Sequence, residues 1–425
     1  MKYKNSIYNV LIPTEDSEKI TIWNTRSGSV LRLLPDVWSA IINESFGESC
    51  ISDFIDGLYN QGVIVPYDFN EYNAILFSRR TCQYAPSSTF SLIIAPTLAC
   101  NFKCEYCFEK GKNHGKIMEE ETKNKIIEFV ENRFKNEKNT KTLSVTWFGG
   151  EPLLGYKAII TSLSESLISL CEKYGINYNS YIVTNGYYMS ADVIPSLVKD
   201  CRITNYQITL DGPEAEYCKK KKATPEEYKT VIDNIFALSS YTFDNHISCQ
   251  INIRINVDKS NYQIAKELVD DLTSDERYRN NIFFYLGKIQ GDGCGCFNLE
   301  EFESVQKDFE KFTNSKLQDI LPTKCVWCDQ QTLNNFCIGP NGEIYKCERD
   351  FGDTAKVVGS LFTGLNYSDH LLGFFDPGIY DKCKSCKLFP VCLGGCPTIA
   401  LEKGYECIST LDRAIELVKR EYKLF

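Results

Sequence analysis

The sequence predicts an α/β protein, built as a partial (β/α)6 barrel of the TIM type with a small α+β domain before it and a cysteine-rich domain after it. Three observations predict this fold. Strand-like and helix-like segments alternate six times between residues 88 and 315, polar or glycine-rich motifs directly follow the strand-like segments, and cysteines crowd into the region after residue 316. We therefore expect three domains, at residues 1–87, 88–315 and 316–425.

The central domain is expected to contain six parallel strands. Each strand candidate is a short apolar run, and an amphipathic helix pattern separates it from the next, as Ile126, Val130 and Phe134 illustrate for the first helix. Parallel strands need a crossover of this kind, so the repeat predicts a parallel sheet curled into a partial barrel. The strand candidates are Phe90–Ala95, Leu143–Phe148, Tyr181–Thr184, Tyr206–Leu210, His246–Val257 and Ile282–Leu286.

Residues 1–87 are expected to form the small α+β domain. Strand-like runs come first, at Tyr8–Pro13, Ile20–Trp23 and Val30–Leu34. Helical patterns follow, and Pro35 with Asp36 opens the first of them. The order is thus a small antiparallel sheet and then helices.

The composition is that of a globular protein with no nucleic-acid or membrane partner. The chain has 425 residues, is 43% hydrophobic and 24% charged, and carries a formal net charge of −9, whereas phosphate binding needs a basic surface. The N-terminus lacks the apolar core of a signal peptide, and no apolar run approaches the roughly 20 residues of a membrane span. We therefore expect a cytoplasmic protein, and we expect its block of like charge, Lys219–Lys222, to be a solvated loop.

Cysteine is the most informative residue type in this chain. There are 20 cysteines and 3 histidines, and in a reducing compartment dense cysteine indicates metal binding or catalysis rather than disulfides. Cys100, Cys104 and Cys107 place three thiols in the loop after the first predicted strand. A structural zinc site needs four protein ligands, whereas three thiolates suit a [4Fe–4S] cluster that leaves one iron open to a small molecule.

This CxxxCxxC motif, followed by the aromatic Phe108, resembles the signature of the radical S-adenosylmethionine (SAM) superfamily, and Gly149–Pro152 (GGEP) resembles that family's second motif. The resemblance implies that the open iron binds SAM and that reductive cleavage of SAM yields a 5′-deoxyadenosyl radical, which abstracts a hydrogen atom. It also implies SAM contacts at the predicted strand ends, where barrel enzymes build their active sites. The implied SAM-binding residues are Tyr106, Gly149, Gly150, Glu151, Asn185, Thr209, Asp211, Arg254 and Asn256.

A second field of cysteines lies beyond residue 316. Its spacing, Gly342-x4-Cys347 and then CxxCxxxxxCxxxC with a final cysteine, resembles the SPASM extension of radical SAM enzymes, which carries two auxiliary [4Fe–4S] clusters. The resemblance thus implies three [4Fe–4S] clusters in all, with two all-cysteine zinc sites as the alternative to the auxiliary pair. The implied outer ligands are Cys383, Cys386, Cys392 and Cys407. The implied inner ligands are Cys347 and Cys396, with partners left open among Cys325, Cys328 and Cys337.

The remaining cysteines show no ligand spacing. Cys294 and Cys296 lie in a glycine-rich loop after the sixth predicted strand, where an incidental pair or a thiol-exchange role both fit. The other six are interpreted as buried thiols: Cys50, Cys82, Cys171, Cys201, Cys218 and Cys249.

Three classes of function fit these motifs. The first is a maturase that crosslinks a ribosomally made peptide (RiPP), and the second is an anaerobic sulfatase-maturating enzyme that forms formylglycine. The third, an iron–sulfur protein without catalysis, is disfavoured by the intact SAM motifs. A Cys thioether is the expected crosslink, although carbon–carbon and carbon–oxygen crosslinks use the same parts. Glu348 and Asp350, just after Cys347, are the candidate catalytic bases, and sulfatase maturases usually carry Asp at the position of Glu348.

The N-terminal domain separates the first two classes. Peptide maturases commonly carry a small winged-helix-like element that captures a leader peptide, and the pattern of residues 6–62 fits such an element. Sulfatase maturases usually begin close to their first cluster motif. The resemblance therefore implies a precursor peptide with a leader as partner, captured by strand addition, and an external electron donor such as flavodoxin or ferredoxin.

Replacing Cys100, Cys104 and Cys107 with alanine should abolish SAM cleavage and leave the auxiliary clusters bound, because those clusters use other thiols. Iron analysis of the purified variant counts what remains. Two auxiliary clusters predict about eight irons per chain, and a content of about four or fewer would contradict the assignment of two.

Overall fold

The computed structural model describes residues 2–16, 18–112, 115–274, 281–289, 295–313, 326–378, 380–404, 407 and 409–424. The chain divides into two compact units. The first unit combines Met1–Ala85, Gln318–Thr332 and Gly373–Phe425, and the second combines Pro86–Leu317 and Leu333–Leu372. The segment predicted as one C-terminal domain, residues 316–425, is therefore divided between the two. No helix within the described ranges is long and apolar enough to cross a membrane.

The second unit is built on a mostly parallel sheet, as the sequence predicts. Six parallel strands run in the order β11-β10-β9-β8-β7-β6, so each βα crossover returns the chain to the neighbouring position. Within the described residues β11 pairs only with β10, which leaves the barrel open at this edge. The strands are β6 (Thr89–Ile94), β7 (Thr142–Trp147), β8 (Asn177–Thr184), β9 (Ile203–Thr209), β10 (Gln250–Val257) and β11 (Ile282–Lys288).

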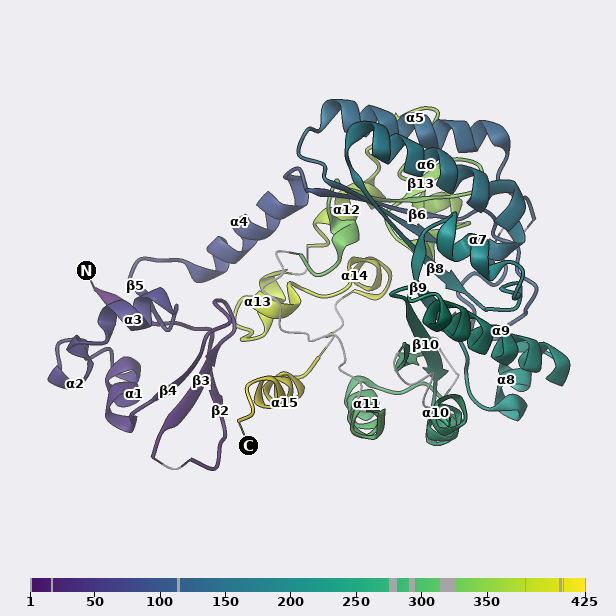
Figure 1. Ribbon diagram of the computed structural model, residues 1–425. Coiled ribbons are helices and arrows are strands. Elements are labelled where there is room, and N and C mark those ends of the chain that lie inside the picture. Colours follow the sequence, from purple (N-terminus) through teal and green to yellow (C-terminus); the bar gives the residue numbers. More distant parts are fainter. Residues whose placement is uncertain are drawn as a thin grey trace. The chain divides into compact units, whose positions relative to one another are not determined.

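Amphipathic helices connect these strands and cover one face of the sheet (Figure 1). Thr224 and Glu227 form a capping box that fixes the start of the longest helix, and Val231, Ile235 and Leu238 of that helix are fully buried. The helices are α5 (Glu120–Asn136), α6 (Thr161–Tyr174), α7 (Ile194–Lys199), α8 (Glu214–Lys221), α9 (Pro225–Asp244), α10 (Ala265–Thr273) and α11 (Leu299–Thr313).

A seventh strand extends the parallel sheet beyond β6. The hairpin predicted around Pro340–Gly342 is present as β12 (Asn335–Ile338) and β13 (Glu343–Tyr345). The prediction that it belongs to a separate C-terminal domain is wrong, because β12 pairs in parallel with β6, from Asn335 opposite Ser91 to Ile338 opposite Ile94. Phe336 of β12 packs its ring against Phe90, which adds apolar contact to the backbone pairing. The short strands β14 (Gly359–Ser360) and β15 (Gly364–Leu365) complete this side.

The first unit contains the predicted small sheet. Strands β2 (Asn9–Ile12), β3 (Ile20–Asn24) and β4 (Val30–Leu33) form it, antiparallel and in that order. Its other N-terminal elements are α1 (Pro35–Ile42), α2 (Ser49–Ser52), α3 (Ile55–Asn60), the pair β1 (Tyr3–Asn5) and β5 (Ile64–Pro66), and α4 (Glu71–Tyr84). Its C-terminal helices are α13 (Phe389–Cys392), α14 (Pro397–Lys403) and α15 (Leu411–Glu421), and α12 (Asp369–Phe375) precedes them.

The two ends of the chain share one hydrophobic core within the first unit. Tyr8 and Tyr72 pack in the same buried cluster as Cys383 and Phe389, and the rings of Tyr72 and Phe389 lie 5.3 Å apart. A second cluster joins apolar residues of β2 and β3 to the C-terminal helices. Its buried members are Val10, Ile12, Trp23, Leu388, Val391, Ala414, Val418 and Leu424. Residues 1–85 therefore bury part of their apolar surface against the C-terminal segments of the same unit.

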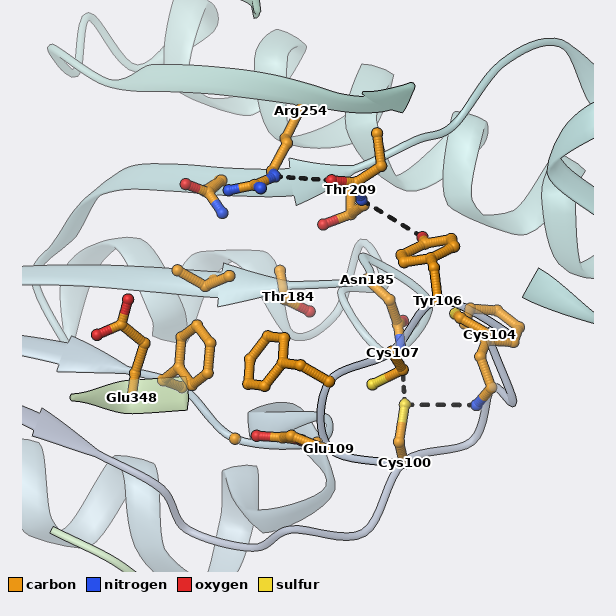
Figure 2. Close-up of a pocket in the computed structure, with 18 of the residues that line it drawn as sticks. Cys100, Cys104, Tyr106, Cys107, Glu109, Thr184, Asn185, Thr209, Arg254 and Glu348 are labelled. Carbon is orange, nitrogen blue, oxygen red and sulfur yellow. Dashed lines mark hydrogen bonds between the residues drawn. The ribbon is translucent and has the colours of Figure 1, made fainter. Parts of the chain in front are cut away.

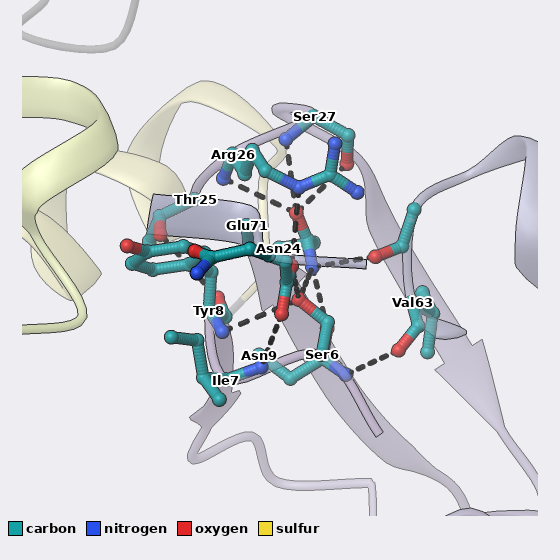
Figure 3. A network of polar contacts seen from close by, with 12 residues as sticks. Ser6, Ile7, Tyr8, Asn9, Asn24, Thr25, Arg26, Ser27, Val63 and Glu71 are labelled. Atoms are coloured by element: carbon teal, nitrogen blue, oxygen red, sulfur yellow. Dashed lines mark hydrogen bonds and ion pairs between the residues drawn. The ribbon is translucent and has the colours of Figure 1, made fainter. Parts of the chain in front are cut away.

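A buried asparagine ties the small sheet to the turns around it (Figure 3). Asn24 is fully buried, and its Nδ2 donates to Ser6 Oγ, Asn9 Oδ1 and the Gly62 carbonyl at 2.8–3.0 Å. Its Oδ1 accepts from the backbone N–H and the hydroxyl of Ser27 at 2.9 and 3.1 Å. One buried side chain thus joins polar groups of Ser6, Asn9, Ser27 and Gly62.

Replacing Asn24 with alanine should destabilise the small sheet by about 2 kcal/mol, because several buried polar groups lose their partner at once. Amide hydrogen exchange of β2 and β3 measures this loss directly. Asn43, which is exposed and has one long side-chain contact to Ser39, serves as the control and should show a change below about 0.5 kcal/mol when replaced with alanine. Equal effects in the two variants would contradict the role given to Asn24.

Candidate functional site

A cavity of about 440 Å³ opens at the carboxyl ends of the parallel strands, entirely within the second unit (Figure 2). Because all strands point the same way, the segments that follow them meet at this edge. The cavity brings together eleven of the residues predicted from sequence. They are Cys100, Cys104, Tyr106, Cys107, Gly149, Gly150, Asn185, Thr209, Arg254, Asn256 and Glu348.

The three cysteines of the first motif lie in the loop after β6. Desolvation is the main cause of the raised pKa of Cys100 and Cys107, and the neighbouring Cys104 contributes to both increases. The backbone N–H of Phe102 donates to Cys100 Sγ at 3.4 Å, which favours the thiolate. Three mutually close thiols of this kind bind iron readily, because coordination replaces the protons that burial would otherwise retain.

The number of thiols in this loop fits an iron–sulfur cluster. A zinc site would need its ligands to converge on one centre, whereas the thiolates of a [4Fe–4S] cluster each bind a different iron and lie farther apart. Three thiols beside an open cavity therefore match the predicted cluster with one iron left for a small molecule.

The GGEP turn after β7 packs directly against the start of the cysteine loop. Gly149 adopts a positive φ of 113°, and a Cβ on Gly150 would lie 2.3 Å from the Ala99 carbonyl oxygen, so neither position accepts a side chain. Glu151 is fully buried and accepts hydrogen bonds from Thr184 Oγ1 at 2.7 Å and from the backbone N–H of Asn185 at 2.8 Å. Its carboxylate is thus engaged with the loop after β8, directly beside the residues that line the cavity.

Asp211 organises one end of the cavity without lining it. Its carboxylate is fully buried and accepts from the Tyr106 hydroxyl and, at 3.1 Å, from the backbone N–H of Asn256. Asn256 Nδ2 in turn donates to the Tyr106 hydroxyl at 3.4 Å. Asp211 therefore holds the Tyr106 hydroxyl and the backbone of Asn256, and both of these residues line the cavity.

The sequence prediction missed Lys221, the cation at this end. Lys221 is 4% exposed, lines the cavity, and holds its Nζ 3.4 Å from Asp211. Burial acts to lower the pKa of Lys221, but Asp211 and the nearby Cys104 outweigh it and raise the pKa. The prediction that Lys219–Lys222 is a solvated loop is wrong, because Lys219, Lys220 and Lys221 form the last turn of α8. The spacing of Lys221 four residues after the buried Tyr217 is the signal that could have placed it inside.

At the other end of the cavity, only one of the two candidate bases lines the cavity. Glu348 lines the cavity, with its Oε2 3.8 Å from Cys347 Sγ. Asp350 does not line it and is fully buried, 3.1 Å from Lys356 Nζ and 3.4 Å from His370 Nε2. Glu109 lines the cavity as well, and the sequence prediction did not include it.

The outer set of auxiliary cysteines is brought together in the first unit. Burial raises the pKa of Cys392 to about 12, and Cys383, Cys386 and Cys407 add to the increase, so the four thiols are close neighbours. All four are the residues implied for the outer cluster.

The inner set is only partly described. Cys328 and Cys396 belong to the first unit and Cys347 to the second. Cys337 is fully buried in an apolar cluster of β12 and its neighbours, which is typical of a core thiol. Cys325, like Cys294, lies outside the described residues.

The other cysteines agree only in part with their interpretation as buried thiols. Cys171, Cys201 and Cys249 are buried. Cys50, Cys82 and Cys218 are partly exposed.

Comparison with known proteins finds a matching domain and several similar proteins. Residues 94–259 match the Radical SAM superfamily. The chain is 23% identical over 445 residues to the radical SAM cyclopropyl synthase TigE of Paramaledivibacter caminithermalis, which covers 93% of this chain and 88% of TigE. It is 24% identical over 380 residues to a cysteine-type anaerobic sulfatase-maturating enzyme of Clostridium perfringens, which covers 75% of this chain and 94% of that enzyme.

Solved structures share the fold. SuiB of Streptococcus suis bound to the precursor peptide SuiA has a TM-score of 0.53 at 15% identity, covering 96% of this chain and 100% of that one. The anaerobic sulfatase-maturating enzyme anSMEcpe with bound AdoMet has a TM-score of 0.57 at 16% identity, covering 79% of this chain and 96% of that one.

Replacing Lys221 with methionine should lower the free energy of unfolding by about 3 kcal/mol, because Asp211 would remain buried without its cation. Urea unfolding followed by circular dichroism measures the change. Lys219 on the same helix, with a side chain 70% exposed, is the matched control, and its replacement with methionine should change the free energy by less than about 0.5 kcal/mol. A Lys221 variant as stable as the Lys219 variant would show that the buried pair is not needed.

Proposed function

The chain carries a Radical SAM superfamily domain over residues 94–259, and on this premise we propose that it is a peptide maturase. In this proposal a 5′-deoxyadenosyl radical abstracts a hydrogen atom from a ribosomal precursor peptide. The peptide bears a leader, and the product is an intramolecular crosslink, for which a Cys thioether is the first candidate.

The extent of similarity carries the proposal. The likenesses to TigE and to SuiB extend over 93% and 96% of the chain. The likenesses to the sulfatase-maturating enzymes extend over about three quarters of it. TigE and SuiB therefore match a larger share of this chain than the sulfatase-maturating enzymes do. This difference favours a function that needs the additional part of the chain, and leader capture is such a function.

The family implies a [4Fe–4S] cluster and SAM, and the cavity holds residues that fit both. Cys100, Cys104 and Cys107 would hold the cluster, which with SAM would supply the radical. Tyr106 and Asn256, both positioned by Asp211, would face the SAM nucleoside, and the buried ammonium of Lys221 would favour a carboxylate at the same end.

Glu348 is the proposed proton acceptor. Forming a C–S bond from a C–H and an S–H group removes two hydrogens and two electrons from the peptide. One hydrogen and one electron leave together in the abstraction, and the thiol proton then needs a base that faces the cavity. Glu348 meets this condition, whereas Asp350 is engaged with Lys356 and His370.

The second electron needs an acceptor, for which the auxiliary cysteines are proposed. Cys383, Cys386, Cys392 and Cys407 would hold the outer cluster. Cys347 and Cys396 would hold the inner cluster with Cys328, and Cys325 remains a candidate for the fourth position. The burial of Cys337 among apolar side chains favours its exclusion from this set. Flavodoxin or ferredoxin would supply the electron that starts each turnover.

The edge of β4 is the proposed site for the leader. Within the described residues β4 pairs only with β3, so its outer backbone groups are available to an added strand. On the opposite side of the sheet, Lys387 Nζ donates to the Asn9 carbonyl of β2 at 2.6 Å, which engages that edge within the unit.

Two other reactions have a specific observation in their favour. The name of TigE, a cyclopropyl synthase matched over most of the chain, favours a carbon–carbon bond in place of the thioether. The match to the Clostridium perfringens enzyme over 94% of its length favours formylglycine formation.

A synthetic peptide that covers a short reading frame found beside the gene is the substrate to test, and the reconstituted enzyme should crosslink it in the presence of SAM and a reductant. Mass spectrometry should show a product that lacks two hydrogens, and alkylation with iodoacetamide distinguishes the bonds, since a thioether consumes a cysteine and a carbon–carbon bond does not. The same peptide without its leader should react far less. In this assay Glu348→Gln should lower kcat by about 100-fold, and Glu105→Gln, an exposed glutamate outside the cavity, should leave it unchanged.

Conversion of a sulfatase-derived cysteine peptide, with the neighbouring peptide left intact, would contradict the maturase proposal. Equal turnover with and without the leader would contradict leader capture alone.

A further inference from the structure

Glu109 is a buried carboxylate in the cavity that none of the roles above uses. It is the second residue after Cys107, it is 4% exposed, and it lines the cavity. Its Oε1 is buried and has no hydrogen-bond partner within the part of the chain that the structure describes. A buried carboxylate oxygen without a partner is costly, and native proteins retain few of them.

The cation beside Glu109 does not provide a hydrogen bond to this oxygen. Lys112 is the charged neighbour that acts on Glu109, but its Nζ donates to the Arg349 carbonyl and lies 5.7 Å from the centroid of the Phe108 ring. Burial raises the pKa of Glu109 to about 7, with Lys112 acting in the opposite direction. The ammonium thus reduces the cost of the buried charge without donating to Glu109 Oε1.

Glu109 belongs to the end of the cavity that Glu348 occupies. Lys112 connects the segments that carry Glu109 and Glu348. Its charge interacts with Glu109, and its Nζ donates to the carbonyl of the residue after Glu348. Figure 2 shows Glu109 and Glu348 on one side of Cys100 and Cys107, and Tyr106 on the other side. The groups proposed for the SAM nucleoside are therefore at the opposite end, and the end with Glu109 is left for the substrate.

We propose that Glu109 is a substrate-binding residue whose Oε1 accepts a hydrogen bond from an N–H group of the peptide, beside the bond that is modified. The inference rests on the proposed peptide substrate. A peptide offers an N–H donor at nearly every residue, and a carboxylate that is already desolvated binds such a donor strongly. The contact would hold the reacting residue against the cysteine loop while Glu348 receives its proton.

This role has a consequence for stability that a structural role lacks. A residue that supports the fold stabilises the protein, whereas a buried acceptor that waits for a ligand destabilises it until the ligand binds. Replacing Glu109 with methionine, which has a similar length and no carboxylate, should therefore raise the unfolding midpoint of the reconstituted enzyme by about 2 °C without peptide. Iron content and the dissociation constant for SAM should stay within about twofold of wild type.

The peptide assay then measures the contact itself. With the synthetic peptide from the neighbouring reading frame as probe, Glu109→Met should raise KM by about tenfold or more, and Glu109→Gln, which keeps a neutral acceptor oxygen, should restore part of the loss. Glu105→Gln is the matched control in the same loop, with a side chain 69% exposed and paired to Lys222, and it should change neither KM nor the midpoint. Peptides methylated at single backbone nitrogens distinguish a backbone donor from a side-chain donor, because only a backbone contact is lost on methylation.

Each result decides the inference. A lower midpoint or a loss of iron in Glu109→Met would show that Glu109 supports the fold or the cluster, and an unchanged KM with active wild-type enzyme would show that it does not contact the peptide. Wild-type enzyme that leaves the peptide unmodified would overturn the proposed function and the peptide contact together, so the two failures are distinguishable.

Discussion

A close contact between two backbone segments sets the geometry of the cavity. The Leu98 and Ala99 carbonyls approach Gly150 so closely that a Cβ would lie 2.5 and 2.3 Å from their oxygens, and the Glu151 N–H donates to the Ala99 carbonyl at 2.8 Å. Because Ala99 immediately precedes Cys100, this contact determines where the cysteine loop begins. The Glu151 side chain extends the same constraint to the loop after β8. One short motif therefore holds three adjacent strand ends together, and the cysteines, Asn185 and the cavity between them depend on it.

Charge is balanced at each end of this cavity in a different way. At one end Lys221 is close to Asp211 and to Cys104, so a single buried ammonium offsets a carboxylate and the cysteine loop. At the other end Lys112 is near Glu109 but donates elsewhere, which leaves an acceptor oxygen unsatisfied. The first arrangement is complete within the protein. The second is incomplete and suits a ligand that binds and leaves.

The features that local sequence encodes were predictable. Each of the strands β6 to β11 is a short apolar run followed by a helix pattern, and the spacing of the motifs at their ends resembles that of radical SAM enzymes. The features that depend on pairing between residues far apart in the sequence were not predictable. Nothing in the few residues of β12 indicates that they pair with β6, which lies more than two hundred residues earlier. Lys221 belongs to a run of four lysines, and only the folded structure shows that it is buried beside Asp211. The hydrogen bonds from Thr184 and Asn185 to Glu151 likewise join residues from separate strand ends.

The core shared by the two ends of the chain also bears on how the protein comes to be folded. Val10 and Trp23 pack against Val391 and Val418, which lie more than 360 residues later in the sequence. The apolar face of the N-terminal sheet is therefore covered only after a very long loop has closed, and closure over such a span is slow. For the same reason, this sheet cannot be exchanged for that of a relative unless the matching C-terminal helices are transplanted with it.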